Sequence, residues 1–240
     1  MVPRPSFPTK LANKKAPASA SAVALRNRSR SLHGPAGIVE APCACVNDHR
    51  VGHEVKRRTL HTSRLRLEAA TPDHADGVWE AIEVSLPELR PWLGWTGDTS
   101  PGQTRQYLER SQLDWESGSQ WNFVILLNDD GVAGSVGINT YLPLNSAASI
   151  GYWLRSDLAG KGIMTEAAGA AAEFAFDDLG LHRLELRAAP GNLGSRRVAE
   201  KLGFKREGVT RSSGRNADGE FHDHVVYGLL STYPRPSRGT

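Results

Sequence analysis

Residues 149–165 constrain the fold more than any other stretch, because they read as a β-strand, a glycine loop and the start of a helix. The segment opens with an apolar strand, and Gly160 and Gly162 follow in a short loop. A second strand is expected at 183–187, where apolar and charged residues alternate. The helix predicted between them, 162–179, joins the two strands by a right-handed crossover. The two strands should therefore lie parallel in one sheet.

Two further helices are predicted ahead of this unit. The first runs from Thr71-Pro72 to about Leu86, since Thr is a good cap and Pro suits the first helical position. Residues 89–95 are aromatic and broken by proline, which predicts a loop or short turn and no helix. A capping box at 100–103 predicts the second helix, to about Ser117. Its inner side is expected to carry Tyr107, Leu108 and Leu113.

Short strands separated by turns predict an antiparallel meander. These strands are expected near residues 65–67, 121–127, 132–141 and 148–154. A short helix at 195–202 and strands at 205–211 and 222–230 complete the chain. The expected fold class is α/β with a mixed (α+β) sheet, in which the meander adjoins a central parallel strand pair flanked by helices.

Charge is distributed unevenly along the 240 residues. Residues 1–63 hold eleven Lys/Arg and three Asp/Glu, a net +8, whereas the rest hold eighteen and twenty-three, a net −5. Residues 1–60 have few large apolar side chains, so we interpret them as a disordered basic extension ahead of a folded domain at 64–232. An inert extension, an RNA-binding arm and an organelle transit peptide are the alternatives for residues 1–60.

The two cysteines, Cys43 and Cys45, lie in that extension and are poorly spaced for a mutual disulfide. No secretory segment or membrane-length apolar run is visible, so we expect a cytoplasmic protein without a membrane partner. His49 and His53 extend the cysteines to a set that could bind zinc, but its spacing matches no standard site. No metal is therefore predicted.

The glycine loop is suited to binding a phosphorylated coenzyme, because a helix N-terminus carries unpaired N–H groups and partial positive charge. A Walker loop is excluded since Gly162 follows Lys161, and a dinucleotide fingerprint fails at Thr165. The alternative is a tight strand-to-helix turn without a ligand. The candidate diphosphate-binding amides belong to Ala159, Gly160, Lys161, Gly162, Ile163, Met164 and Thr165.

Several motifs occur in order along the chain. They are Ile150-Gly151-Tyr152-Trp153-Leu154, Gly160-Lys161-Gly162-Ile163-Met164-Thr165, Asn192-x-x-Ser195, Lys201-Leu202-Gly203-Phe204 and Gly219-Glu220-Phe221-His222-Asp223. This combination resembles the GNAT N-acetyltransferases, and within them the RimJ/RimL branch of protein N-terminal acetyltransferases. The resemblance covers about residues 64–232, and the segment 92–95 is similar to the substrate-side loop of that branch.

The resemblance implies that acetyl-CoA is the cosubstrate and lies between two splayed parallel strands. Its pantetheine chain would pair with the strand at Tyr152, Trp153 and Leu154, where Gly151 is compatible with a bulge. Asn192 would contact the pantetheine or diphosphate, and Ser195 would donate the proton to the CoA thiolate. The structural alternatives are a turn residue for Asn192 and a helix cap for Ser195.

Two departures from the family pattern affect the catalytic assignments. Many members use a tyrosine as general acid where this chain has Ala199, so either Ser195 replaces it or no acid is needed. RimL-like members resemble one another in having a glutamate that acts as the base in the segment after the short helix. In this chain that segment is 211–216, and it contains no Asp or Glu. The nearest titratable substitutes, directly or through a water relay, are Asp218, Glu220, His222, Asp223 and His224. His222 and Asp223 are the candidates chosen, with a structural hydrogen-bonding pair as their alternative.

Trp92, Trp95 and Tyr152 are the candidates for the acceptor-binding wall. The preferred acceptor is a protein or peptide N-terminal α-amino group, for example on a ribosomal protein. Two alternatives remain at this point: acetylation of a small amine or antibiotic, and a catalytically silent acyl-CoA-binding regulatory domain. Nucleic-acid binding is not expected outside the basic extension, and a homodimer is left open.

Overall fold

The computed structural model describes residues 59–128 and 131–234. The predicted extension at 1–60, except for its last two residues, lies outside this part of the chain, and so do Cys43, Cys45, His49 and His53. The first strand of the described part begins at Leu60, four residues ahead of the expected start at Arg64.

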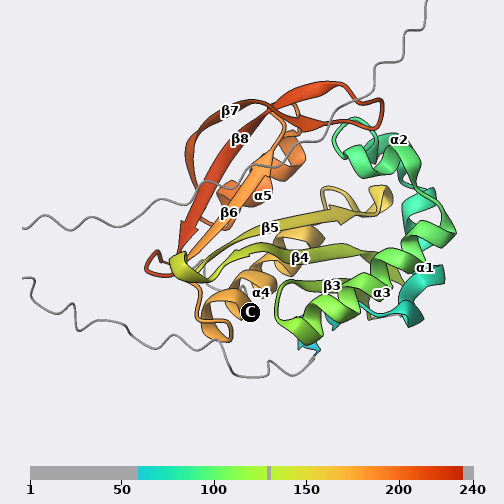
Figure 1. Ribbon diagram of the computed structural model, residues 1–240, viewed down its shortest axis with the longest axis horizontal. Helices are drawn as coiled ribbons and strands as arrows, with labels where there is room; N and C mark the ends of the chain where they lie inside the picture. The colour runs from blue at the N-terminus through green and yellow to red at the C-terminus, as the bar shows by residue number, and fades with distance from the viewer. Residues whose placement is uncertain (1–58, 129–130, 235–240) are drawn as a thin grey trace, which may run out of the picture. The chain divides into compact units, whose positions relative to one another are not determined.

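An eight-stranded mixed sheet forms the centre of the described part, in the order β1-β2-β3-β4-β5-β6-β8-β7 (Figure 1). All neighbouring strands are antiparallel except β5 and β6, which run parallel as predicted. The strands are β1 Leu60–His61, β2 Leu65–Ala69, β3 Trp121–Leu127, β4 Val132–Leu142, β5 Ala147–Leu154, β6 Arg183–Ala188, β7 Lys205–Arg215 and β8 Phe221–Leu230.

Helices cover both faces of the sheet. The α-helices are α1 Ala75–Glu83, α2 Leu86–Leu89, α3 Pro101–Ser117, α4 Ile163–Asp177 and α5 Leu193–Lys201. The larger apolar cluster joins α4 and the buried Ala199 of α5 to one sheet face. The smaller cluster joins α1 and Leu108 of α3 to the other face, through Val124 and Val132. Short 3-10 turns η1 Pro72–His74, η2 Gly94–Asp98, η3 Pro143–Asn145 and η4 Ser156–Leu158 connect these elements.

The region before β3 differs from its prediction in three places. The single helix expected at 71–86 is divided into η1, α1 and α2. α1 ends at Glu83, whose carbonyl oxygen cannot receive a helical hydrogen bond from Pro87 because proline has no N–H. The 3-10 turn η2 runs over residues 94–98, whereas the loop or short turn was expected at 89–95. The capping box before α3 is half formed: the Gln103 amide donates to the Ser100 hydroxyl at 3.3 Å, and no reciprocal bond reaches the Ser100 amide.

The inner side of α3 is also only partly as predicted. Leu108 is buried, but Leu113 is 58% exposed and Tyr107 is 46% exposed. The buried positions Thr104, Leu108, Ser111 and Trp115 follow the helical repeat along one face, and Leu113 lies off that face. Tyr107 turns only its hydroxyl inward, where burial raises its pKa and hydrogen bonds with Ser111 and Ser135 oppose the rise.

Candidate active site

The parallel strands β5 and β6 separate soon after they pair. Their register contains three residue pairs, from Ala147–Arg183 to Ser149–Glu185, although β5 continues to Leu154 and β6 to Ala188. No bulge causes this separation, since Gly151 pairs regularly with Gly137 of β4, which corrects the expectation of a bulge at Gly151. The β6-facing edge of β5 is therefore open to an extended ligand from residue 150 onward.

The predicted phosphate loop lies between η4 and α4. Gly160 and Gly162 have φ angles of 77° and 78°, and Gly162 is the N-cap residue of the 15-residue helix α4. Such angles strain any residue with a Cβ atom, so the two glycines create the turn that leaves the first amides of α4 without intrahelical partners. Residues 159–165 thus meet at one helix N-terminus, a site suited to a diphosphate group.

An ion pair between Arg64 and Glu166 holds this loop. The Arg64 guanidinium donates to the Lys161 carbonyl oxygen at 3.0 Å and to the Glu166 carboxylate at 2.7 Å. Glu166 also accepts a 2.6 Å hydrogen bond from the Thr62 hydroxyl. Burial raises the Glu166 pKa, but the hydrogen bonds from Thr62, Arg64 and Ser63 outweigh it and lower the pKa overall. Sequence reasoning missed this contact because 102 positions separate its two partners.

The hydroxyl groups of Tyr152 and Ser195 meet across the opening between β5 and α5. Their oxygens lie 3.1 Å apart, and the Tyr152 hydroxyl also donates to the Ser195 carbonyl oxygen at 3.2 Å. Burial raises the pKa of Tyr152 to about 12, so its phenol keeps its proton at neutral pH. Asn192 is the N-cap of α5 and accepts from the Ser195 amide at 3.0 Å. The Ser195 hydroxyl is therefore not needed to cap α5 and could take part in proton transfer.

Ala199 occupies a core position in α5. It is fully buried in the larger apolar cluster, so a side chain here faces the core in this structure. The structure brings the hydroxyl of Ser195, the predicted proton donor, together with that of Tyr152, a residue that the sequence had indicated only for cofactor and acceptor binding.

Trp95 and Trp153 contact each other on the sheet face opposite to the Tyr152 side chain. The rings of Trp95 and Trp153 make an edge contact with their centroids 6.4 Å apart. Both rings line a cavity of about 360 Å³, together with residues of α1 and α3. Trp153 thus offers its backbone to the open edge of β5 and its ring to this cavity.

The loop that carries Trp92 forms a rim above the site. Trp92 packs against Gly191, next to the cap of α5. Arg90 pairs with Asp218 at 2.9 Å, and its carbonyl oxygen accepts from the Ala217 amide at 3.0 Å. Figure 1 shows the resulting approach of α2 to the β7–β8 turn. Three segments far apart in sequence therefore enclose one opening.

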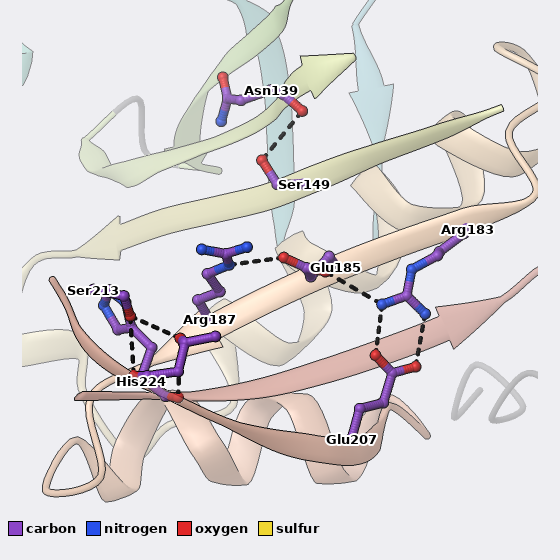
Figure 2. A network of polar contacts seen from close by, with 9 residues as sticks. Asn139, Ser149, Arg183, Glu185, Arg187, Glu207, Ser213 and His224 are labelled. Carbon is purple, nitrogen blue, oxygen red and sulfur yellow. Dashed lines mark hydrogen bonds and ion pairs between the residues drawn. The ribbon is translucent and has the colours of Figure 1, made fainter. Parts of the chain in front are cut away.

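His222 and Asp223 do not act as a hydrogen-bonded pair. The Asp223 carboxylate accepts from the Ser212 amide at 2.9 Å, which holds an irregular part of β7 where Ser212 has a φ of 49°. The His222 ring instead contacts that of His224, with the centroids 5.0 Å apart. His224 also lies 3.1 Å from the Ser213 hydroxyl (Figure 2). Burial, then His222 and Arg187, lower the pKa of His224, which favours its neutral, proton-accepting form.

No group of three or more His, Cys, Asp or Glu side chains among residues 59–128 and 131–234 could hold a metal ion. In the same ranges, no helix has the length and apolar character needed to cross a bilayer.

The mixed sheet, the separated parallel strands and the glycine loop at a helix N-terminus together define an acyl-CoA-dependent acyltransferase fold. Residues 64–205 match the acetyltransferase (GNAT) domain family. YdaF of Bacillus subtilis (strain 168) is 35% identical over 169 residues, which cover 69% of this chain and 91% of that protein. The chain therefore belongs to the GNAT acetyltransferase family and is an N-acetyltransferase.

Two further relatives carry names that specify an acceptor. The ribosomal-protein-serine acetyltransferase of Escherichia coli (strain K12) is 27% identical, over 62% of this chain and 83% of its own length. The solved structure of RimL, a ribosomal L7/L12 alpha-N-protein acetyltransferase in complex with coenzyme A, superposes with a TM-score of 0.68 at 25% identity. This match covers 72% of this chain and 98% of that one.

Proposed function

We propose that this N-acetyltransferase transfers the acetyl group of acetyl-CoA to the N-terminal α-amino group of a protein, with a ribosomal protein as the preferred acceptor. The Tyr152–Ser195 contact beside the open β5 edge carries the proposal of acetyl transfer, because two hydroxyl groups meet next to the strand that we expect to pair with pantetheine. The names of the E. coli relative and of RimL support the choice of acceptor. A ribosomal acceptor would place the reaction in the cytoplasm.

The residues present fit acetyl-CoA. The amides of residues 159–165 would hold its diphosphate, and the free edge of β5 at Tyr152, Trp153 and Leu154 would pair with its pantetheine. Asn192 keeps the first turn of α5 beside that edge. When bound, acetyl-CoA supplies an acetyl group activated as a thioester.

The two proton transfers of the reaction are assigned to different side chains. A neutral amine is needed for attack, and His222 with His224 would take the ammonium proton, directly or through water. Asp223 would act as a positioning residue by holding the irregular part of β7 beside them. The Ser195 hydroxyl, hydrogen-bonded to Tyr152, would donate to the departing thiolate.

Steady-state acetyl transfer to N-terminal peptides and to a panel of small amines tests the proposal. We expect peptides to be acetylated and small amines to be poor acceptors. Ser195→Ala should lower kcat about a hundredfold, within the range for general acid catalysis. Ser117→Ala, on the exposed end of α3, is the matched control.

Two results would contradict the proposal. Efficient acetylation of small amines alone would make the protein a small-molecule acetyltransferase. Binding of CoA without acetylation of any amine, unchanged by Ser195→Ala, would indicate a silent acyl-CoA-binding domain.

A further inference from the structure

The cavity beside Trp153 is not used by any of the steps above. It lies between α1, η2, the start of α3 and β5, with a volume of about 360 Å³. Three aromatic side chains line it: Trp95, Tyr107 and Trp153. Trp95 and Tyr107 are 45% and 46% exposed, so a ligand can reach them from solvent. Because Trp153 follows Tyr152 in β5 and successive strand side chains point to opposite faces, the cavity and the Tyr152–Ser195 contact lie on opposite faces of the sheet at neighbouring strand positions.

The charge of the cavity is negative. Asp98 is the one charged side chain among its lining residues, and no ion pair of the Asp98 carboxylate is found within the described ranges. Aromatic faces attract cations through their quadrupoles, and a nearby carboxylate adds a direct Coulomb attraction. A cation therefore complements this combination, whereas an anion would be repelled by Asp98.

The cavity wall also contains the buried hydroxyl group of Thr104. Thr104 is 4% exposed, and its hydroxyl oxygen is buried with no hydrogen-bond partner in the described part of the chain. Buried hydroxyl groups are rarely left unpaired, and a ligand group entering between η2 and α3 would place a polar partner close to it. The aromatic rings of the cavity wall suit an apolar stem of a ligand, and its polar groups suit a polar end.

We propose that this cavity binds the cationic side chain of a Lys or Arg at the second or third residue of the acceptor peptide. The inference rests on the proposed function and adds a substrate preference to it. An extended peptide advances about 3.3 to 3.6 Å per residue, so a peptide that passes the open edge of β5 brings its second or third residue toward the cavity when its α-amino group is at the reaction centre. The methylene stem would pack against the rings of Trp95 and Trp153 that line the cavity, and the cation would face Asp98.

Peptides that differ only at residues two and three test this preference. In the wild-type protein we expect kcat/KM for Lys and Arg peptides to exceed that for matched Glu peptides about tenfold. Asp98→Asn should reduce this ratio to about twofold or threefold, mainly through KM. Asp76→Asn removes an equal charge from the exposed side of α1 and should leave the ratio unchanged.

Direct binding separates this proposal from the function on which it rests. The affinity of the CoA-loaded full chain for the Lys and Glu peptides is measured by calorimetry, without any acetyl transfer. A Lys preference that Asp98→Asn removes supports the cavity even if the acetylation assay fails. Equal affinities for the two peptides, or a Lys preference that survives Asp98→Asn, would overturn it.

Discussion

At the scale of single residues, the site depends on two hydroxyl groups that reach it from different elements. Tyr152 comes from β5 and Ser195 from α5, and their oxygens are 3.1 Å apart. The phenol with its raised pKa of about 12 remains protonated, so it can hydrogen-bond the carbonyl and hydroxyl oxygens of Ser195 and hold that side chain in place. We therefore expect Tyr152 to support proton donation by Ser195 as well as to line the acceptor site.

Replacing Tyr152 with phenylalanine tests that role. Tyr152→Phe keeps the ring packing and removes both hydrogen bonds to Ser195, so kcat should fall about tenfold with little change in the KM for acetyl-CoA. Tyr141→Phe, at a ring that packs on Trp121, is the control and should retain full kcat. An unchanged kcat in Tyr152→Phe would assign proton donation to Ser195 alone.

At the scale of elements, the start of α4 is held by the turn between β1 and β2. Arg64 joins the Lys161 carbonyl to the Glu166 carboxylate, and Thr62 adds a third contact. The side chain of Glu166 is 17% exposed and that of Arg64 is 48% exposed, so solvent screens this ion pair only in part. The glycine loop thereby gains a rigid support that its own sequence lacks.

Glu166→Gln should loosen that support. We expect the KM for acetyl-CoA to rise about fivefold with kcat nearly unchanged, and the free energy of unfolding to fall by about 1 kcal/mol. Steady-state kinetics and urea denaturation measure the two effects. Glu109→Gln on the exposed side of α3 serves as the control. A change in kcat alone would place Glu166 in the chemistry instead of in the support.

At the scale of the whole molecule, polar side chains tie the strands beyond the opening to one another. Arg187 donates to Glu185 at 2.7 Å, Glu185 accepts from Arg183 at 3.3 Å, and Arg183 binds Glu207 of β7 at 2.6 Å (Figure 2). The arginine bonds lower the pKa of Glu207, and burial opposes this in part. The network links β6 to β7 across the intervening strand β8.

These pKa shifts predict that acid destabilises the protein in two steps. The pKa of His224 is lowered from 6.5, so the unfolded chain takes up a proton first and stability begins to fall below about pH 6.5. The pKa values of Glu166 and Glu207 are lowered from 4.5, so the stability they contribute is present above that pH and is lost as the pH falls through their folded values.

Thermal unfolding between pH 7 and pH 3.5 measures both steps. Glu207→Gln should lower Tm at pH 7 and flatten the decline below pH 4.5, whereas His224→Gln should flatten the decline that begins below pH 6.5. A Tm that rises on acidification would contradict the direction of these shifts.

Local sequence patterns predicted most of the elements, because period and turn chemistry act over a few residues. The meander, the parallel pair, the glycine loop and helix α4 were all expected from such patterns and are confirmed. The errors at residues 71–98 arose where proline and aromatic residues gave conflicting local signals. The side of α3 on which Leu113 lies depended on packing and could not be inferred from its apolar character.

The sequence by itself determined the fold class and the location of the candidate coenzyme loop, since strand period, glycine conformation and helix capping are properties of neighbouring residues. Only the tertiary structure decided that Tyr152 meets Ser195, that Arg64 holds Glu166 and that His224 contacts His222. The physical reason is that hydrogen bonds, ion pairs and burial depend on distances in space. The sheet, with β5 and β6 separated, sets those distances between residues that lie far apart along the chain.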